Sequence, residues 1–382
     1  MMTRKIFVLS GKRGGFGAMK PMLRLLRDDP RFELMLVLTD QHVSDTFGNT
    51  IQEVSKEFAV SATVEMNQKD GSPQSRSAAL ATCMAGMTNV LADLDPNICV
   101  LYGDRGEVLT TATVATVMGY PIAHIQGGDV SGSADEQMRH AVTKLSQLHF
   151  PSTQKSAERI KLMGEPDKHI FVVGDNHIDL IVAGEFTPST DIGNKLGLNL
   201  DRPIITLLQH SETTEPEAAY SQMCETLHAI RKTGEQTVVV HPCSDPGYEG
   251  IIEAINEIAV PPQFRVHINL EAPDFWGLLN ISSVFIGNSS AGLIETPYLR
   301  LPAINVGRRQ IGRLHAENVL HVPHVETEIK AALDTAIYDA KFRSNIDNCS
   351  QPFGDGTAGE QIVEILANVE LGNSLIVKQM TY

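Results

Sequence analysis

The chain has 382 residues, of which 42% are hydrophobic and 20% charged, a composition typical of a globular protein long enough for two domains. Its formal net charge of −15 argues against binding to nucleic acid or to an anionic membrane through a basic surface. The five cysteines show no CxxC spacing, and no apolar run approaches the roughly 20 residues that span a bilayer. We therefore expect reduced thiols, no membrane segment and a cytoplasmic protein.

The first half of the sequence alternates short apolar runs with longer amphipathic segments. The longer segments, for example 76–94 and 108–118, predict helices. The short runs lack the period-two alternation of half-exposed strands, as is typical of a parallel sheet covered by helices on both faces. We predict these strands at 6–9, 34–38, 98–101, 122–125 and 170–173.

A stretch rich in Pro, Thr, Gly and Asn at 185–202 predicts a connection between domains, after which the pattern restarts. The second set of predicted strands is 204–208, 237–240, 264–268, 284–286 and 303–306. We expect an α/β fold of two Rossmann-like domains facing across a cleft. The expected parts are a carboxylate-bearing domain at 1–188, a nucleotide-binding domain at 189–357, and a C-terminal helix or tail at 358–382 that packs back on the first domain.

Charged side chains follow the predicted strands, where ligands bind in open α/β sheets. After the strand at 98–101 come Asp104, Arg105 and Glu107. Asp104 is suited to act as a base or an acid, and Arg105 to contact phosphate. Capping of the next helix by an acidic residue is the alternative. The glycine-rich turn at 10–17 lacks GxGxxG spacing, so a ligand contact and a tight turn both stay open.

The loop after the strand at 122–125 contains a glycine pair between Gln126 and Asp129. Glycines there suggest that the backbone lies close to a small ligand. The helix that follows begins with Asp135 and Glu136, which are further candidate acids. The alternative for Asp135 is an ion pair with Arg139, four residues later on the same helix face.

In the second half, His210 follows the strand at 204–208 and is placed to carry a proton or bind phosphate, although a lone histidine is more often structural. The strongest local pattern is the run 286–295, where a strand enters a turn of small residues and then a helix. Hydroxyl and backbone N–H groups of such a turn hold a diphosphate, and Glu295 is placed to accept both ribose hydroxyls. Capping by a serine explains one hydroxyl without a ligand.

Three blocks of the sequence together resemble one family: GDRGE at 103–107, HIQGGDVSGSADEQMRHAVTKLSQLHF at 124–150, and the segment from IGNSSAGLIE to ENVLHV at 286–322. The family is that of the hydrolysing UDP-N-acetylglucosamine 2-epimerases of sialic-acid and related nonulosonate pathways. The resemblance implies a glycosyltransferase-B-like fold, a UDP-sugar substrate, no metal, no cofactor, and a homo-oligomer, either a dimer or a tetramer.

The reaction that this resemblance implies releases UDP from UDP-N-acetylglucosamine and inverts C-2, giving N-acetylmannosamine. A base removes the C-2 proton while UDP leaves C-1, and water then adds to the 2-acetamidoglucal. This chemistry needs a carboxylate near C-2, an acid or cation near the leaving phosphate, and a second proton-transfer group.

The resemblance carries roles to individual positions of this chain. Because an amide cannot shuttle a proton, Asp129 or Glu136 would do that work if Gln126 holds the place of the family's acid or histidine. The catalytic candidates are Asp104, Asp135, Glu136, Asp129, His210, Gln126, Arg105 and His42. The nucleotide-binding candidates are Arg13, Asn288, Ser289, Ser290, Gly292, Glu295, Arg309 and Arg313.

The chain departs from the family at three places: the first turn at 12–16, Gln126, and the segment 241–243. The first turn lacks the family's acidic side chain and tyrosine hydroxyl. These departures concern the sugar more than the nucleotide. The alternatives are therefore the same reaction on UDP- or GDP-N,N'-diacetylbacillosamine, a non-hydrolysing 2-epimerase, a glycosyltransferase of the same fold, and a nucleotide-sugar-binding regulator without catalysis.

Overall fold

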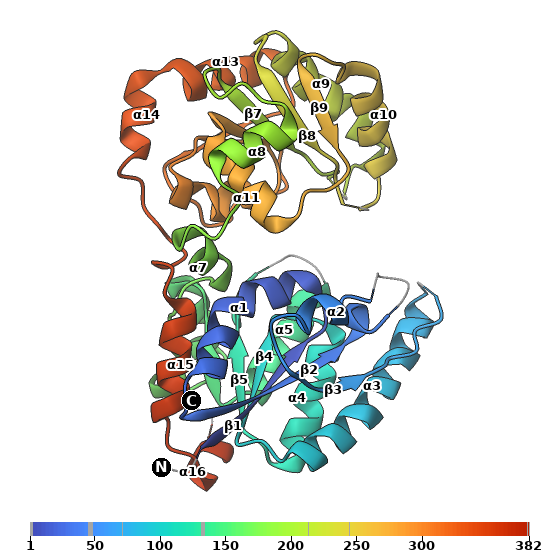
Figure 1. Cartoon of the computed structure of the whole chain (residues 1–382), viewed down its shortest axis with the longest axis vertical. Coiled ribbons are helices and arrows are strands. Elements are labelled where there is room, and N and C mark those ends of the chain that lie inside the picture. The colour runs from blue at the N-terminus through green and yellow to red at the C-terminus, as the bar shows by residue number, and fades with distance from the viewer. Residues whose placement is uncertain are drawn as a thin grey trace. The chain divides into compact units, whose positions relative to one another are not determined.

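The computed structural model describes residues 3–44, 49–70, 72–130, 134–212, 214–243, 245–379 and 381. The chain divides into two compact units (Figure 1). Unit 1 combines Met1–Leu180 with Phe353–Tyr382, and unit 2 is Ile181–Pro352. Within the described residues, each unit is built on a six-stranded parallel sheet of its own.

The sheet of unit 1 has the strand order β3-β2-β1-β4-β5-β6. The register places Ile6 of β1 opposite Leu34 of β2 on one side and Ile98 of β4 on the other. Neighbouring strands β1 and β4 therefore end together, and their following loops share one edge of the sheet. The strands are β1 Arg4–Ser10, β2 Phe32–Thr39, β3 Val60–Val64, β4 Ile98–Tyr102, β5 Ile122–Ile125 and β6 Leu148–Phe150.

Helices cover both faces of this sheet because successive side chains of a strand point to opposite faces. Ile6 and Val8 of β1 pack in one buried cluster with α1 and α15, and Phe7 and Leu9 pack in another with α3 and α4. This explains why the strand reads as a continuous apolar run. The helices of unit 1 are α1 Arg13–Asp28, α2 Ile51–Val54, α3 Pro73–Leu94, α4 Gly106–Met118, α5 Ala134–Leu145, α6 Gln154–Leu162, α7 Asn176–Val182, which crosses the unit boundary, α15 Ala358–Asn368 and α16 Asn373–Ile376, with short 3-10 turns at η1 Asp40–His42 and η3 Asp167–His169.

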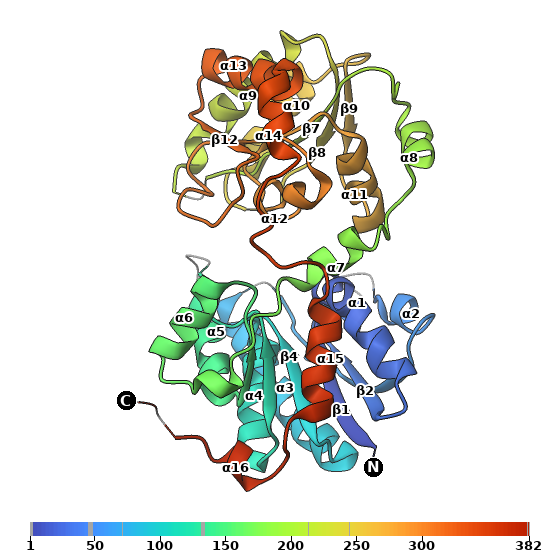
Figure 2. The same cartoon turned by 90° about the vertical axis from the view of Figure 1, so that its left-hand side faces the viewer.

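The C-terminal segment belongs to unit 1, where α15 lies beside α1 (Figures 1 and 2). The two oxygens of Asp179 accept the backbone N–H groups of Ala358 at 3.0 Å and Gly359 at 2.7 Å. At the other end of α15, Arg4 Nη1 donates to the Leu366 carbonyl at 2.7 Å. These bonds satisfy backbone groups that a helix leaves unpaired at its ends.

Unit 2 repeats the topology of unit 1. Its order, β12-β11-β10-β7-β8-β9, is the same order counted from its own first strand, β7. The strands are β7 Ile204–Leu208, β8 Gln236–Val240, β9 Phe264–His267, β10 Val284–Gly287, β11 Ala303–Val306 and β12 Val319–Val322. The helices are α8 Ser189–Leu196, α9 Ala219–Arg231, α10 Tyr248–Ile258, α11 Ala272–Ile281, α12 Ala291–Ile294, α13 Glu326–Tyr338 and α14 Ala340–Ile346, with 3-10 turns at η4 Pro216–Ala218 and η5 Thr296–Leu299.

The strand order places a topological switch point in each sheet, between β1 and β4 in unit 1 and between β7 and β10 in unit 2. At such a point the connections run to opposite sides, and the loops that follow the two strands leave a crevice where ligands bind. Of the predicted site residues, Asp104 follows β4, His210 follows β7 and Asn288 follows β10. The fold thus confirms that two Rossmann-like units carry them.

Most of the predicted strands are present in the structure. One predicted strand is wrong, and three strands of the structure were not predicted. The run 170–173 forms a single bridge, from Ile170 to His149, instead of a strand. Backbone bonds from Phe171 to the His149 carbonyl and from Val173 to the Pro151 carbonyl keep it extended beside β6. The strands β3, β6 and β12, and the helix α8 inside the predicted connection, are not predicted.

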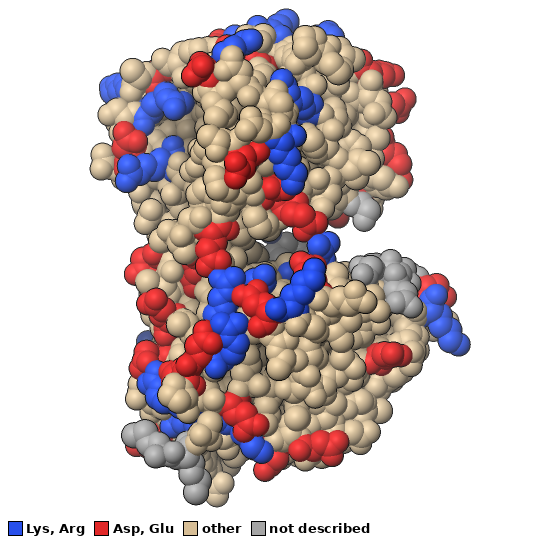
Figure 3. All heavy atoms as spheres, in the orientation of Figure 1, with Lys and Arg blue, Asp and Glu red and all other residues tan. Residues whose placement is uncertain are grey.

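Charge is dispersed over the surface that Figure 3 shows, where basic and acidic side chains are interspersed on both units. On α1, Lys20 and Arg24 both pair with Glu57, at 3.1 and 2.6 Å. Among the residues that the structure describes, none of the helices combines the length and the apolar character that crossing a bilayer requires.

Candidate active site

A buried ion network forms where the loops after β4 and β5 meet α5. Asp104, two residues after β4, pairs with the guanidinium of Arg139 in α5. Nη1 of the same guanidinium lies 3.6 Å from Asp129 Oδ2. Arg139 is only 9% exposed, so water screens its charge little. The network therefore holds two carboxylates and one cation at the carboxyl edge of the unit 1 sheet.

Asp129 has a second set of contacts, with α6. Ser156 donates its hydroxyl to Asp129 Oδ1, and Arg159 Nη1 donates to the Gly128 carbonyl at 2.9 Å. Gly128 has a φ of +76°, and a Cβ there would lie 2.3 Å from the Ser156 backbone oxygen, so this close approach requires glycine. Burial raises the pKa of Asp129 above its usual value, which makes its carboxylate a stronger base.

A second polar chain runs from Gln126 to His177. Gln126 adopts a left-handed φ of 62° and donates its Nε2–H to Asp175 Oδ2 at 3.0 Å. The other oxygen, Oδ1, accepts the backbone N–H of His177 and lies 3.0 Å from ring atom Nδ1. Burial raises the pKa of Asp175, but hydrogen bonds from His177 and Gln126 outweigh it and leave the pKa below its usual value. Asp175 is thus an ionised carboxylate that orients the His177 ring.

Tyr102, the last residue of β4, contacts the ring of His177. Its hydroxyl lies 3.4 Å from His177 Nδ1, and the two rings meet edge to face with centroids 6.3 Å apart. Burial raises the pKa of Tyr102 well above its usual value, and the negative charges of Asp175, Asp129 and Asp104 add to the rise. Tyr102 is therefore a neutral phenol surrounded by carboxylates.

The structure places Arg105 between two carboxylates, 3.7 Å from Asp40 Oδ2 and 3.8 Å from Glu107 Oε1. Arg76 pairs with the same two acids at 3.1 and 2.8 Å. Glu107 is 1% exposed, and burial raises its pKa. Its carboxylate lies against Gly11, where a Cβ would come within 2.5 Å of Oε1. This second network packs against the turn that follows β1.

His42 and Arg13 differ in how open they are. The His42 ring is fully buried, with Nε2 2.9 Å from Ser10 Oγ and Nδ1 2.6 Å from Thr50 Oγ1. Burial lowers its pKa. Arg13 begins α1, half-exposed, 3.4 Å from Glu53 Oε2. A ligand can therefore reach the Arg13 guanidinium, whereas both ring nitrogens of His42 already have hydroxyl partners.

Asp135 and Glu136 lie in the first turn of α5 and are both half-buried. Glu136 Oε1 lies 3.7 Å from Nε2 of His140, one turn later. Among the described residues Arg139 pairs with the carboxylates of the preceding loops, so the alternative helix pair with Asp135 is not formed. Residues 131–133 of the same motif lie outside the described residues.

In unit 2, the side chain of Asn288 joins the ends of β7 and β10. Its Oδ1 accepts the backbone N–H of His210 at 2.6 Å, and its Nδ2 donates to the His210 carbonyl at 2.9 Å. The Asn288 carbonyl accepts bonds from Arg309 Nη1 at 3.2 Å and from Gln310 Nε2 at 2.8 Å. One amide thus fixes both loops of the switch point and places the Arg309 side chain beside them.

The ring of His210 is neutral. The backbone N–H of Cys243 donates to its Nδ1 at 3.2 Å, and because a backbone N–H can only donate, the ring proton is assigned to Nε2. Burial and the charge of Arg309 lower the pKa of His210 to about 4. Near pH 7, His210 therefore presents an N–H donor, not a cation, to a ligand.

One cluster has the donors of a metal site. His210, Cys243 and Asp245 each place a ligand atom within 4.8 Å of the others, and imidazole, thiolate and carboxylate are ligands for zinc. Asp245 Oδ2 also lies 3.5 Å from Arg309 Nη2. The carboxylate therefore has a cationic partner within the chain, which competes with a metal for it.

The turn of small residues after β10 is compact. Ser289 Oγ accepts the backbone N–H of Ala291 at 3.4 Å, and Ser290 precedes α12 without capping it. The helix is four residues long. Gly292 packs on the ring of Phe285, where a Cβ would lie 2.7 Å from Cε1. Close packing is thus a sufficient reason for glycine at this position.

Glu295 and Arg313 border this turn in different ways. Glu295 directly follows α12, and its Oε2 accepts the indole N–H of Trp276 at 3.1 Å. That bond fixes the carboxylate relative to α11. Arg313 lies in the loop after β11, exposed to solvent. The two residues are therefore a fixed acceptor and an accessible cation.

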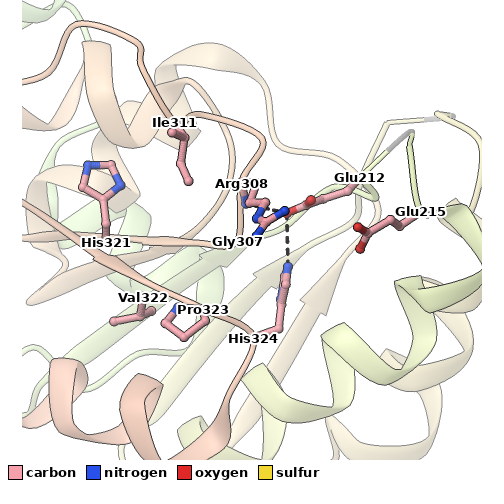
Figure 4. A pocket seen from close by; sticks show the side chains of 9 residues that line it. All are labelled: Glu212, Glu215, Gly307, Arg308, Ile311, His321, Val322, Pro323 and His324. Carbon is pink, nitrogen blue, oxygen red and sulfur yellow. Dashed lines mark hydrogen bonds and ion pairs between the residues drawn. The ribbon is translucent and has the colours of Figure 1, made fainter.

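A cavity of about 510 Å³ opens at the carboxyl ends of β11 and β12 (Figure 4). Glu212 Oε1 accepts the backbone N–H of Arg308 at 2.6 Å and lies 3.2 Å from His324 Nε2. A Cβ on Gly307 would lie 2.2 Å from Glu212 Oε1. None of the candidate residues predicted from the sequence lines this cavity. Its lining residues are Glu212, Glu215, Gly307, Arg308, Ile311, His321, Val322, Pro323 and His324.

The sequence candidates omit Asp175, His177 and Tyr102, and they treat Arg139 only as a helix partner. The sequence contains a signal for Asp175 and His177, because they follow the apolar run 170–173 just as other candidates follow predicted strands. No local pattern pairs Arg139 with Asp104, since 35 residues separate them.

Comparison with known proteins identifies one family. Residues 24–367 match the family model described as UDP-N-acetylglucosamine 2-epimerase. The chain is 31% identical, over the full length of both proteins, to the UDP-N,N'-diacetylbacillosamine 2-epimerase (hydrolyzing) of Legionella pneumophila. It is 28% identical to the UDP-N-acetylglucosamine 2-epimerase of Neisseria meningitidis serogroup B, over 97% of each chain.

Among solved structures, the fold is similar to that of UDP-GlcNAc 2-epimerase from Neisseria meningitidis bound to UDP-GlcNAc. The TM-score is 0.78 at 18% identity, covering 95% of this chain and 99% of the other. At this identity the likeness concerns the fold. It confirms the glycosyltransferase-B-like fold class at the level of two parallel-sheet α/β units.

Proposed function

We propose, from the premise that this chain belongs to the UDP-N-acetylglucosamine 2-epimerase family, that it is a hydrolysing 2-epimerase of a UDP-linked 2-acetamido sugar. The observation that carries this proposal is the Asp104–Arg139–Asp129 network at the carboxyl edge of the unit 1 sheet. A carboxylate of raised basicity favours removal of a proton from carbon, and the half-buried Asp129 provides one.

The proposed reaction has two steps. First, a carboxylate of the network takes the C-2 proton, the C-1–oxygen bond breaks, and UDP leaves the 2-acetamidoglucal. Second, a proton adds to C-2 and the oxygen of water bonds to C-1, giving an N-acetylmannosamine-type sugar. Asp104, Asp129, Asp135 and Glu136 are the proposed acids and bases, and Gln126, Arg105 and His42 are proposed to support them.

Unit 2 is proposed to hold the nucleotide. Glu295, whose Oε2 accepts the indole N–H of Trp276, is the proposed acceptor of the ribose hydroxyls. Neutral His210 donates its Nε2–H to the leaving phosphate. The proposed diphosphate ligands of unit 2 are Arg309, Arg313, Asn288, Ser289, Ser290 and Gly292, and Arg13 is the candidate from unit 1.

The decisive experiment is incubation with UDP-N-acetylglucosamine in deuterated water, followed by NMR and mass spectrometry of the products. We expect UDP together with N-acetylmannosamine that carries deuterium at C-2. UDP release without deuterium at C-2 would contradict elimination. Intact UDP-N-acetylmannosamine would indicate a non-hydrolysing epimerase, and sugar transfer to an acceptor without C-2 exchange would indicate a glycosyltransferase.

A second candidate substrate is UDP-N,N'-diacetylbacillosamine, or its GDP counterpart. Gly15 lies against the ring of Tyr102, where a Cβ would be 3.4 Å from Cδ1, and nothing lies within 4 Å of the corresponding position at Gly14. We propose that the absence of side chains at Gly14 and Gly15 makes room for an extra acetamido group. A relative named for this substrate matches the whole chain. Rates on a panel of UDP- and GDP-sugars decide between the candidates.

The proposed physiological setting is the supply of a mannosamine-type sugar for sialic-acid or nonulosonate synthesis by a cytoplasmic dimer or tetramer. Light scattering after size-exclusion chromatography tests the oligomeric state. A monomer at micromolar concentration would contradict this part of the proposal.

A further inference from the structure

We propose that His177, oriented by Asp175 and Gln126, is the second proton-transfer group of the active site and delivers the proton to C-2 when water adds to the glucal. The proposal rests on the proposed function, because it assigns a residue to the second step of that reaction. Asp175 and Gln126 are positioning residues in it, and His177 is the catalytic one.

The first support is the geometry of the histidine. Asp175 Oδ1 accepts both the backbone N–H of His177 and its ring Nδ1–H, each at 3.0 Å. An ionised carboxylate only accepts, so the ring proton is assigned to Nδ1, and the proposal assigns the proton transfer to Nε2. The His177 side chain is 34% exposed, so a substrate can reach it.

The second support is the rigidity of the carboxylate. Asp175 Oδ2 is occupied by the Gln126 amide, and the Asp175 backbone N–H donates to the Phe353 carbonyl at 2.7 Å. Gly174 packs on the same backbone, where a Cβ would lie 2.7 Å from the Phe353 oxygen. The C-terminal segment thus fixes the position of Asp175, and the orientation of the imidazole follows from it.

The third support is the place of Gln126 in the chain of contacts. Gln126 follows β5 in a left-handed conformation that is uncommon for a residue with a side chain. Its amide cannot transfer a proton near neutral pH, so Gln126 can act here only through its hydrogen bond to Asp175. By donating to Asp175 it supports a carboxylate that in turn stabilises an imidazolium.

Capping of α7 is the competing explanation for Asp175, because its Oδ1 accepts a backbone N–H in the first turn of that helix. Capping explains neither the bond from Gln126 nor the bond to the His177 ring. It also does not explain the approach of the Tyr102 hydroxyl to within 3.4 Å of Nδ1.

The proton balance of the proposed step is complete. The imidazolium Nε2–H bond breaks, the C-2–H bond forms, and the oxygen of water bonds to C-1. The proton that this water loses returns to neutral Nε2. The carboxylic acid formed in the first step releases its proton to solvent, which accounts for the single proton that accompanies UDP release.

The main test compares His177→Asn with the wild-type enzyme. The Asn amide keeps a donor near the position of Nδ1 for Asp175 but has no atom in place of Nε2. We expect kcat for sugar formation to fall ~100-fold with little change in KM, as for loss of a positioned proton-transfer group. UDP release continues in excess of sugar, and the glucal accumulates. His169→Asn, in the same unit outside the site, is the matched control and keeps wild-type rates.

Direct supply of the glucal with UDP separates the second step from the first. We expect His177→Asn to hydrate it ~100-fold more slowly than wild type. Wild-type hydration, or equal loss of UDP release and sugar formation without glucal, overturns the assignment of His177. Absence of UDP release from every 2-acetamido sugar by the wild-type enzyme is a different result, which overturns the proposed function itself.

The pH profile tests the role of Asp175. Asp175 and Tyr102 lie 3.0 and 3.4 Å from His177 Nδ1. The charges that act on Tyr102 include those of Asp104, Asp129 and Arg139. Removing the Asp175 charge destabilises the imidazolium, so Asp175→Asn should move the alkaline limb of kcat to lower pH. Gln126→Ala removes only the hydrogen bond to Oδ2 and keeps the Asp175 charge, so the limb should move less than in Asp175→Asn. An unmoved limb in Asp175→Asn contradicts the positioning role.

Discussion

The two sheets of this protein share a strand order but carry different chemistry at their carboxyl edges. In unit 1, the loops after β4 and β5 bring together Asp104, Asp129 and the buried cation Arg139. In unit 2, the loops after β7 and β10 are joined by the neutral amide of Asn288, which bonds both backbone groups of His210. The same topology thus fixes where ligand-facing residues lie, while the few residues after each strand decide what they do.

At the carboxyl edges of both sheets, burial shifts pKa values so that the neutral form of the side chain is favoured. It raises the pKa of Asp129 and Glu107 in unit 1 and lowers the pKa of His210 to about 4 in unit 2. The result is a stronger base in one unit and a neutral donor in the other. The proposed division is therefore carbon chemistry in unit 1 and nucleotide binding in unit 2.

The largest expected effect is that of Asp104→Asn, which tests the charge cluster of unit 1. The amide keeps the shape of the side chain but removes its basicity and its charge opposite Arg139. We expect turnover to fall by ~100-fold or more with the fold intact, measured as UDP release and by circular dichroism. Asp167→Asn, at an exposed ion pair with Lys161, is the control and keeps the wild-type rate. Wild-type turnover in Asp104→Asn would remove that carboxylate from the mechanism.

A comparable loss, ~100-fold in turnover, is expected for His210→Ala, which removes the neutral donor of unit 2. Because the pKa of His210 is lowered to about 4, its protonation should affect wild-type activity only as the pH falls toward 4. A rate profile from pH 3.5 to 8 checks this. An acid limb near pH 6.5 that disappears in His210→Ala would show that the histidine titrates as an exposed one does.

A smaller effect, ~10-fold, is expected for Glu295→Ala on the dissociation constant of UDP, with less change in kcat. The carboxylate is proposed to bind the ribose, so its loss weakens the nucleotide more than it slows the chemistry. Calorimetric titration with UDP measures the change. Trp276→Phe keeps an aromatic ring but removes the indole N–H that fixes Glu295, and should weaken UDP binding less. Unchanged UDP affinity in Glu295→Ala would end the ribose assignment.

The smallest effect is structural and confined to unit 1. Asp179→Ala removes the acceptor of two N–H groups at the start of α15 and should destabilise the attachment of that helix by ~1–2 kcal/mol. Hydrogen exchange of α15 and a thermal melt measure it. Burial raises the pKa of Asp179 to about 6, so its protonated form stabilises the fold below its unfolded pKa, and this stability is lost as the pH rises through 6.

The matched variant Asp179→Asn sharpens that last prediction. The variant side chain cannot ionise. The unfolding midpoint of the variant minus that of the wild type should therefore increase as the pH rises from 4 to 7. A difference that stays constant over this range would mean that Asp179 keeps an ordinary pKa in the folded protein.

Strand-end candidates were predictable where a buried strand is long and apolar on both faces. This applies to Asp104 after β4 and to His210 after β7. Edge strands lack that pattern: β3 alternates half-exposed and exposed residues, and β6 has only three residues. The extended run 170–173 has strand composition but forms a single bridge, because composition reports burial and not pairing.

Contacts between distant loops were beyond sequence reasoning. The periodicity of α5 suggests Asp135 as the partner of Arg139, yet Asp104 and Asp129 receive its guanidinium from other loops. His177 has no motif of its own, and only the approach of Asp175 and Tyr102 singles it out. Pairings that depend on register and on the packing of helices have no signature in the local sequence.

The return of the chain to unit 1 at Phe353 has a consequence for synthesis. Ile362, Val363 and Leu366 of α15 belong to the same buried cluster as β1 and α1, so that core stays incomplete until almost the whole chain has been made. Unit 2 possesses all of its residues earlier. During translation, therefore, the inserted unit can finish folding first, and the unit that contains the N-terminus finishes last.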